Sequence, residues 1–202
     1  RAIRSIVARR PARRLISTFF APPLRDPGRA TLVAPILRPE VLALAPSSGE
    51  HVLVYINGTV APEWVVRTLG PVDARFLVYG VATGRSVETG SVTFRPPSVD
   101  AFLADLASCR AVVSTAGFTL LSEALHLGKP VLAVPNRGIY EQALNAAYLE
   151  RQGRGQAVFG AVRPDAVRQF LAGAEALASP PGGPDGLADA IDGIEEALPA
   201  PR

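Results

Sequence analysis

The strongest constraint on this sequence is an alternation, from residue 51 onward, of short apolar runs with longer segments of helical period. The short runs are rich in β-branched residues, and the longer ones repeat apolar residues three and four positions apart. Most short runs are apolar throughout, which favours central parallel strands over half-exposed antiparallel ones. The predicted strands are 51–56, 75–79, 91–95, 111–114, 131–134 and 156–159. We therefore predict an α/β fold, a parallel sheet with helices on both faces.

The helical segments between these strands begin at residues that commonly start helices. Ser98 precedes the segment 99–108, where its hydroxyl can cap the first turn. Pro164 stands at a first-turn position before residues 165–178. The caps agree with the apolar pattern and strengthen the prediction of alternating strands and helices.

Prolines interrupt the chain on either side of this alternation. Residues 15–20 and 32–37 look like strands, but nearby prolines break up their surroundings. We predict that residues 1–48 are the tail of a missing N-terminal domain plus a Pro-rich linker. Residues 49–178 form the α/β domain. A second cluster of breakers and a C-terminal helix fill 179–202.

The composition is that of an ordinary globular protein, with 202 residues, 48% hydrophobic and 19% charged. A chain of this length can bury a sizeable core without covalent staples. Its one cysteine, Cys109, cannot form an intrachain disulfide. We find no apolar leader and no run long enough to cross a bilayer, so we expect a cytoplasmic protein. The sequence has no methionine, and we expect it to be a fragment.

The basic character of the chain is local. The net charge is +3, but residues 1–40 carry nine arginines against two acidic residues. The Arg-rich first 14 residues could contact nucleic acid or anionic lipid head groups. They could also be the solvated face of a helix that belongs to the missing domain. We favour the helix and expect no nucleic-acid partner.

In an open parallel sheet, ligands bind outside the carboxyl ends of the strands, so the residues after each strand are the first candidates for a site. Asn57, Gly58 and Thr59 follow the strand 51–56. Free backbone N–H groups and the Thr59 hydroxyl would make an anion site at the start of the next helix. Alternatively, these residues only turn the chain and cap the helix.

A second junction follows the strand 111–114. Gly117 would let the start of a helix approach a ligand without a side chain intervening, where a diphosphate could bind. Glu123 lies nearly two turns along this otherwise apolar helix. A carboxylate there needs a partner, which could be a pair of ribose hydroxyls or a structural salt bridge.

A third junction follows the strand 131–134. Glu141, Gln142 and Asn145 have spacings that place them on one face at the start of a helix. They offer both donors and acceptors, as the vicinal hydroxyls of a sugar require. Amides are also common on ordinary helix surfaces, so this pattern alone leaves both interpretations open.

Taken together, these residues resemble the donor-site signature of GT-B glycosyltransferases. The match runs through 117–123, Gly128-Lys129-Pro130, Pro135 and Glu141-Gln142-x-x-Asn145-Ala146. That family includes UDP-glycosyltransferases and the bacterial enzyme that adds N-acetylglucosamine to the lipid-linked peptidoglycan precursor. The resemblance covers about residues 50 to 175. It implies the C-terminal half of a GT-B fold, with 49–178 as a Rossmann-like nucleotide-sugar-binding domain.

The resemblance also implies a role for each position. Glu123 would hold the ribose hydroxyls, Arg95 would stack on the base, and backbone atoms near Val99 would read the edge of the base. Glu141 and Gln142 would contact the transferred sugar. The diphosphate would be bound by residues of the three junctions: Gly58, Thr59, Thr115, Gly117, Phe118, Thr119 and Asn145.

Two positions depart from the family pattern. Thr115 stands where many members have a histidine that touches phosphate, although a hydroxyl can still donate a hydrogen bond there. The cell-wall branch also lacks that histidine. Asn57 stands where others carry a glycine or an aromatic residue, which leaves acceptor contacts at this junction open.

The resemblance implies transfer of a hexosyl group from a UDP-sugar to an acceptor hydroxyl, with no metal and no cofactor. His51 and His126 are expected to be structural, and we predict no metal ligands. We name no catalytic base in this chain, because the family carries its base and acceptor site in the N-terminal domain. The isolated chain is therefore expected to be inactive. A lipid acceptor would place the protein at the inner face of the membrane.

Two alternatives remain at this point. One is a non-catalytic module that binds sugar nucleotides or proteins. The other is half of a nucleotide-sugar 2-epimerase, which would need a histidine and further carboxylates facing the sugar.

Overall fold

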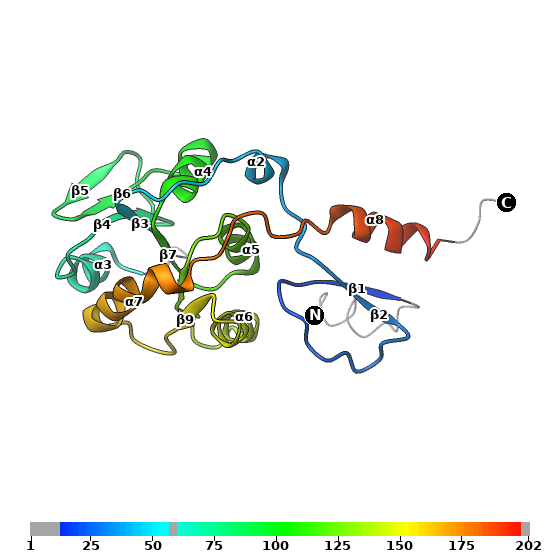
Figure 1. Cartoon of the computed structure of the whole chain (residues 1–202). Helices are drawn as coiled ribbons and strands as arrows, with labels where there is room; N and C mark the ends of the chain where they lie inside the picture. The colour runs from blue at the N-terminus through cyan, green and yellow to red at the C-terminus, as the bar shows by residue number, and fades with distance from the viewer. Residues whose placement is uncertain (1–12, 57–59, 199–202) are drawn as a thin grey trace. The chain divides into compact units, whose positions relative to one another are not determined.

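The computed structural model describes residues 13–56 and 60–198, and the chain divides into two compact units (Figure 1). The larger unit is Arg38–Gly183. The described part of the smaller unit comprises residues 13–37 and 184–198. The sequence predicts boundaries of the α/β domain at 48/49 and 178/179. The missing N-terminal domain stays a prediction.

A seven-stranded sheet forms the centre of the larger unit, in the order β5-β6-β4-β3-β7-β8-β9. All neighbouring strands are parallel except β5, which is antiparallel to β6. The strands are β3 His51–Tyr55, β4 Arg75–Tyr79, β5 Val87–Thr89, β6 Val92–Phe94, β7 Ala111–Ser114, β8 Val131–Ala133 and β9 Gly155–Ala157. Without β5, the order is that of a doubly wound Rossmann sheet, which reverses between β3 and β7.

The prediction of six parallel strands is confirmed, and β4 and β7 have the predicted bounds. The sequence did not predict β5. Its three residues, Val87, Glu88 and Thr89, are all exposed and pair only with the edge strand β6. A strand that buries nothing leaves no apolar pattern to read.

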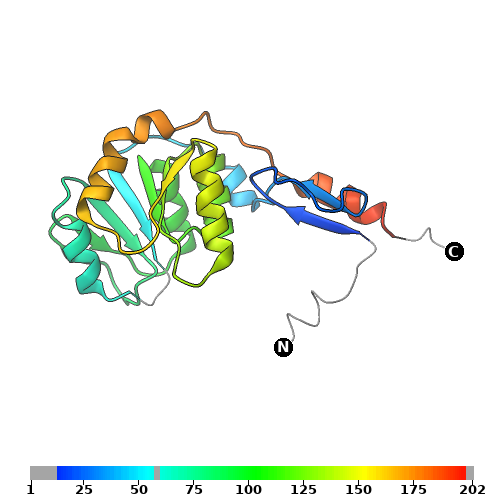
Figure 2. The ribbon, with the colours of Figure 1, turned by 90° about the horizontal axis from the view of Figure 1, so that it is seen from below.

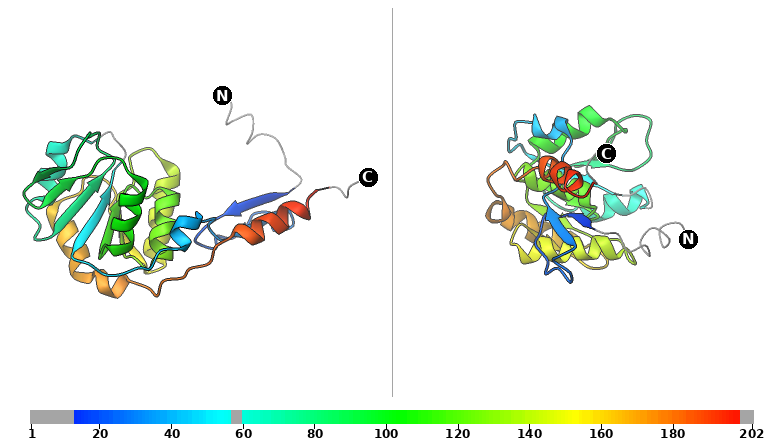
Figure 3. Two further views of the ribbon diagram at one scale, coloured as in Figure 1. Left: turned by 90° about the horizontal axis from the view of Figure 1, so that it is seen from above. Right: turned by 90° about the vertical axis from the view of Figure 1, so that its right-hand side faces the viewer.

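Helices cover both faces of the sheet, as predicted (Figures 2 and 3). One face carries α3 (Pro62–Leu69) and α7 (Pro164–Leu177), whose buried side chains join the main apolar core with Val54 and Val113. The helices α4 (Val99–Ser108) and α5 (Phe118–His126) contact β3 and β7. The remaining helices of this unit are α2 (Pro39–Leu42) and α6 (Tyr140–Arg151).

Aromatic and aliphatic side chains fill the space between the sheet and these helices. Phe76 of β4 and Phe170 of α7 are both 0% exposed and belong to one cluster. Burying a side chain of this kind stabilises a fold by about 1.5–3 kcal/mol. The predicted helix starts are confirmed for α4, where the Ser98 Oγ accepts a hydrogen bond from Ala101 N at 3.3 Å, and for α7, which begins at Pro164.

The smaller unit contains a parallel pair of strands, β1 (Arg14–Ser17) and β2 (Ala30–Val33), and the helix α8 (Leu187–Glu195). The strand-like runs near the N-terminus therefore pair with each other despite the prolines around them. A Cβ on Gly193 would meet the Leu15 side chain at 2.8 Å, so the helix packs closely on β1. Among the described residues, no helix is long and apolar enough to span a membrane.

Candidate functional site

Two cavities open at the carboxyl ends of the central strands, where the strand order reverses. This is the position at which open α/β sheets bind ligands. One cavity, of about 490 Å³, lies against α4 and α5, and we call it the polar cavity. The other, of about 930 Å³, lies against α3, and we call it the apolar cavity. Both are lined by Ser114 and Thr115 at the end of β7.

The polar cavity brings together most of the site residues that the sequence predicted. They come from the turn after β7, the first turns of α5, the start of α4 and the start of α6. The predicted residues in its lining are Val99, Thr115, Gly117, Phe118, Thr119, Glu123 and Gln142. These residues are far apart in the sequence and converge on one cavity.

Three predicted residues do not line this cavity. Arg95 contacts Tyr79 and Asp105: its Nε donates to the Tyr79 hydroxyl at 3.4 Å, and its NH2 lies 3.3 Å from the Asp105 carboxylate. Asn145 is 3% exposed and donates to the Ala116 carbonyl at 3.1 Å. Glu141 is exposed at the start of α6. The predicted contacts Gly58 and Thr59 lie outside the described residues.

A salt bridge forms one wall of the polar cavity. Arg38 Nε donates to Glu123 Oε1 at 2.7 Å, and Arg38 NH2 donates to Oε2 at 3.0 Å. The Glu123 side chain is 2% exposed and that of Arg38 is 36% exposed. The hydrogen bond to Glu123 raises the pKa of Arg38, against the opposing effect of burial. Of the two partners that the sequence left open for Glu123, the structure contains the salt bridge.

The turn between β7 and α5 is held from two sides. Ala116 has a φ of 61°, a conformation that costs a residue with a Cβ about 1 kcal/mol or more. The Ser114 Oγ accepts from Ala116 N at 3.2 Å, and the Asn145 amide binds the Ala116 carbonyl. The next residue, Gly117, is the N-cap of α5, and a Cβ there would meet nothing within 4 Å. The start of α5 is thus fixed in place and open to the cavity.

Aromatic residues form another wall of the polar cavity. The Tyr79 hydroxyl donates to Asp105 Oδ2 at 2.6 Å. Burial, followed by this hydrogen bond, raises the pKa of Tyr79 to about 12. The Phe102 ring packs edge-on against Tyr79, with centroids 5.1 Å apart, and against Tyr55 at 5.8 Å. This wall offers flat apolar surface beside the start of α4.

The sequence missed Arg38 and the aromatic wall. Arg38 belongs to a stretch that we predicted to be a linker. The sequence feature that could have indicated its role is that it is the single charge among the apolar residues and prolines at 35–39. Tyr55, Tyr79 and Phe102 carry no motif. They meet only because β3 and β4 pair in register and α4 crosses beside them.

The Gly128-Lys129 part of the motif is structural. Gly128 has a φ of 73°, and a Cβ there would lie 2.3 Å from the Ser179 carbonyl oxygen. Lys129 is 6% exposed, and its Nζ donates to the carbonyls of Ser47 and Cys109. Burial lowers the pKa of Lys129 and raises that of the Cys109 thiol to about 11.

Within residues 13–56 and 60–198, no group of three or more His, Cys, Asp or Glu side chains could hold a metal ion. Both histidines contact backbone carbonyl oxygens. His51 Nε2 lies 2.9 Å from the oxygen of Asp105, and His126 Nδ1 lies 2.7 Å from that of Gly183. Both also lie outside the lining of the polar cavity.

The fold and the position of the cavities are those of a doubly wound α/β domain. Residues 1–174 match the profile of the family described as glycosyl transferase family 1. The chain therefore belongs to glycosyl transferase family 1, and the resemblance seen in its sequence is confirmed at the level of the family.

Two curated relatives are glycosyltransferases of Methanosarcina species. An uncharacterized glycosyltransferase of Methanosarcina acetivorans is 29% identical over 163 residues, which cover 75% of this chain and 42% of the relative. A second, from Methanosarcina mazei, is 28% identical over 135 residues, covering 62% of this chain and 35% of the relative. The chain thus spans less than half the length of these relatives.

Solved glycosyltransferase structures share the fold. The kitacinnamycin glycotransferase aligns with a TM-score of 0.59 and 20% identity, over 86% of this chain and 51% of that one. The calicheamicin glycosyltransferase CalG4 gives 0.56 and 21%, over 86% and 48%. Os79 from O. sativa, solved in complex with UDP and deoxynivalenol-3-glucoside, gives 0.53 and 19%, over 73% and 40%. The predicted Rossmann-like half of a GT-B fold is confirmed.

Proposed function

We propose that the polar cavity binds a UDP-sugar and that this chain is the donor-binding half of a metal-independent hexosyltransferase. One observation carries the proposal. At least one residue that the resemblance assigns to each of the diphosphate, ribose, base and sugar lines a single cavity at the switch point of the sheet. Membership of glycosyl transferase family 1 supports it, as does the UDP bound to Os79, which shares the fold.

In this proposal the start of α5 binds the diphosphate. Thr115, Gly117 and Thr119 line the cavity, and backbone N–H groups of the first helical turn together with the two hydroxyls would be the donors. The same donors would stabilise the negative charge that develops on the departing diphosphate. Asn145 acts on this region indirectly, because its amide holds the carbonyl of the preceding turn.

The ribose subsite is formed by Glu123 and Arg38 together. Arg38 uses one acceptor position on each carboxylate oxygen, and an ionised carboxylate has about four such positions. The remaining positions can accept from the 2′ and 3′ hydroxyls. Arg38 and Glu123 are the charged residues in the cavity lining, so the pair adds no net charge.

The base lies between Val99 and the aromatic wall. Arg95 acts on it through Tyr79, whose hydroxyl it contacts. Gln142 and the exposed Glu141 contact the sugar. The Gln142 side chain is oriented by a hydrogen bond that its Oε1 accepts from Asn136 N at 2.9 Å. The acceptor site and the catalytic base are assigned to the rest of the protein, in keeping with the length of the relatives. An epimerase would need a histidine beside the sugar, and both histidines lie outside this cavity.

Thermal unfolding with nucleotides tests the proposal. UDP or a UDP-sugar should raise the melting temperature in the presence of EDTA, and more than GDP, dTDP or ADP does. Gly117→Ala is the sharpest variant, because its φ of −65° suits alanine and its Cβ meets no atom within 4 Å. Its methyl group would enter the diphosphate subsite, so we expect the affinity for UDP to fall about tenfold or more, about 1.4 kcal/mol.

Gly173→Ala is the matched control, since a Cβ on Gly173 also meets nothing within 4 Å and the residue lies in α7, outside the cavity. It should bind UDP like the wild type. Glu123→Ala should remove the response to UDP. If no nucleotide raises the melting temperature of the folded wild-type chain, the proposed donor site is wrong.

A further inference from the structure

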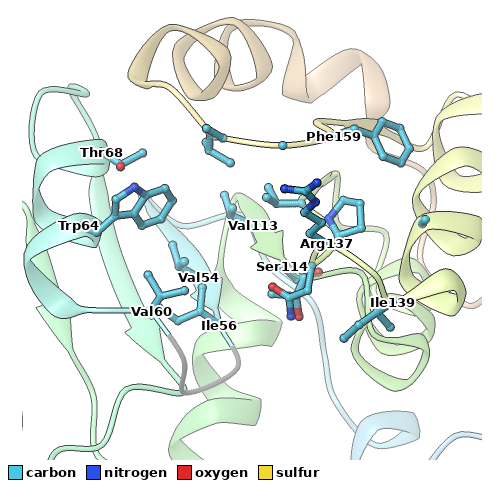
Figure 4. A pocket seen from close by; sticks show the side chains of 18 of the residues that line it. Val54, Ile56, Val60, Trp64, Thr68, Val113, Ser114, Arg137, Ile139 and Phe159 are labelled. Atoms are coloured by element: carbon cyan, nitrogen blue, oxygen red, sulfur yellow. The ribbon is translucent and has the colours of Figure 1, made fainter.

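The apolar cavity opens at the carboxyl ends of the strands. Small-molecule sites occupy about 300–1,000 Å³. At about 930 Å³, this cavity falls in the range of ligand sites (Figure 4). It lies on the α3 side of the switch point, and the proposed function above makes no use of it.

The floor of the cavity is the main core of the domain. Val54, Val65 and Leu69 are 2%, 1% and 4% exposed and belong to the core cluster, yet each also lines the cavity. Trp64 and Val113 also line the cavity, and Figure 4 shows them near Val54. Because these floor residues leave little surface to bury, the gain of about 25 cal/mol for each Å² of apolar surface buried comes mainly from the partly exposed Trp64 and from the rim. The body of the ligand is therefore apolar.

The rim carries large exposed apolar side chains. Ile139 is 41% exposed, Phe159 is 60% exposed and Tyr140 is 80% exposed, and all three line the cavity. Ile139 lies in the loop after β8, Tyr140 begins α6, and Phe159 lies in the loop after β9. Clustered exposed apolar side chains of this kind mark binding sites on protein surfaces. The apolar surface thus continues from the floor of the cavity to its mouth.

One charge faces this apolar surface. Among the residues that the structure describes, Arg137 is the charged one in the lining, and none supplies a carboxylate to the cavity. Figure 4 shows its side chain extending from the loop after β8 into the space between Val113 and Phe159. A guanidinium in such a place complements an anion, because it presents a fixed fork of N–H donors to carboxylate or phosphate oxygens.

We propose that the apolar cavity binds an anionic amphiphile, with its hydrocarbon part against Trp64, Val54 and Leu69 and its anionic group on Arg137. The two cavities share Ser114 and Thr115, so the bound amphiphile lies beside the donor site on the same strand ends. The inference goes beyond donor binding and does not depend on it.

The chain carries a built-in reporter, because Trp64 is its one tryptophan and lines the cavity. Dodecyl phosphate, kept below its micelle concentration, should change the Trp64 emission in a saturable way. Dodecanol should bind about tenfold or more weakly, since a charge-assisted hydrogen bond contributes more than 1.4 kcal/mol. Inorganic phosphate alone should leave the emission unchanged.

Two variants and a control complete the test. Arg137→Ala should weaken dodecyl phosphate to the level of dodecanol, and Ala143→Phe should fill part of the cavity and abolish the saturable change. Arg151→Ala, an exposed arginine at the end of α6 and outside the lining, should bind like the wild type. No saturable change, or equal binding of dodecyl phosphate by wild type and Arg137→Ala, would overturn the proposal.

The response to UDP distinguishes a failure of the amphiphile site from a failure of the donor site. If UDP raises the melting temperature but dodecyl phosphate leaves Trp64 unchanged, the donor site stands and the amphiphile site is wrong. If dodecyl phosphate binds through Arg137 and UDP does not bind, the amphiphile site stands and the donor assignment is wrong.

Discussion

The polar and apolar cavities are lined by neighbouring residues of the same two strands. Tyr55 lines the polar cavity and its register partner Ser114 lines both cavities, whereas the preceding partners, Val54 and Val113, line the apolar cavity. Successive side chains of a strand point to opposite faces, so a shift of one residue separates the two environments. A single strand pair therefore supplies two chemically different sites at one edge of the sheet.

The arginine that lines each cavity has a different environment. Arg38 is held by both oxygens of a buried carboxylate before any ligand arrives. Arg137 is exposed, and within 13–56 and 60–198 no carboxylate lines its cavity. The first arginine is thus part of the folded framework, and the second is available to a ligand. This difference predicts unequal effects when each is removed.

The largest expected effect is that of Arg38→Ala on stability. It leaves the Glu123 carboxylate, 2% exposed, without its partner, and breaking a buried ion pair in this way costs about 3–5 kcal/mol. Arg137→Ala should change the free energy of unfolding by no more than about 0.5 kcal/mol, as surface substitutions usually do. Denaturant unfolding at neutral pH measures both values.

A double variant shows whether the unpaired charge is the cause. Arg38→Ala with Glu123→Gln removes the charge but keeps the shape of the side chain, so it should recover most of the loss. A double variant no more stable than Arg38→Ala would show that the charge on Glu123 is not what destabilises the single variant.

The sequence predicted the polar cavity better than the apolar one, for a physical reason. Gly117, Glu123 and Gln142 follow strands at intervals set by the chain itself, so their spacing carries the information. The apolar cavity is made of residues such as Val54 and Trp64, which look like ordinary core residues in the sequence. Whether such residues fill a space or surround one depends on packing between distant segments.

The Arg38–Glu123 pair shows the same limit within the polar cavity. The sequence indicated that Glu123 needed a partner, but the partner lies 85 positions away. Pairing between such distant residues follows from the tertiary fold. The Asn145 side chain is a similar case, because its spacing suggested a ligand contact and the structure has it binding the Ala116 carbonyl.

A smaller effect is expected from pH, again on the polar side. The pKa of Tyr79 is raised in the folded state to about 12 from an ordinary value of 10.0, so folding favours its neutral form. Its contribution to stability is fully present below pH 10 and is lost as the pH rises through 12. Phenolate absorbance, compared between wild type and Tyr79→Phe, should show one tyrosine titrating near pH 12.

Unfolding at high pH provides the second measurement. The stability of the wild type should fall toward that of Tyr79→Phe as the pH rises above 10. Tyr140→Phe, from the rim of the apolar cavity, controls for the loss of one phenol from the absorbance. A constant difference between wild type and Tyr79→Phe over this range would contradict the raised pKa.

The smallest expected effect concerns the helix starts beside the two cavities. At the polar cavity, Ser98 caps α4 through its Oγ, and Ser98→Ala should cost about 1 kcal/mol. At the apolar cavity, α3 begins after Ala61, which has no side-chain cap and an extended backbone at φ −66° and ψ 136°. Ala61→Ser should therefore stabilise the fold by a similar or smaller amount.

Because both residues are exposed, packing changes little. Changes of opposite sign in the free energy of unfolding, measured with denaturant, therefore test capping alone. Equal signs would mean that the cap on α4 does not set the difference between the two helix starts.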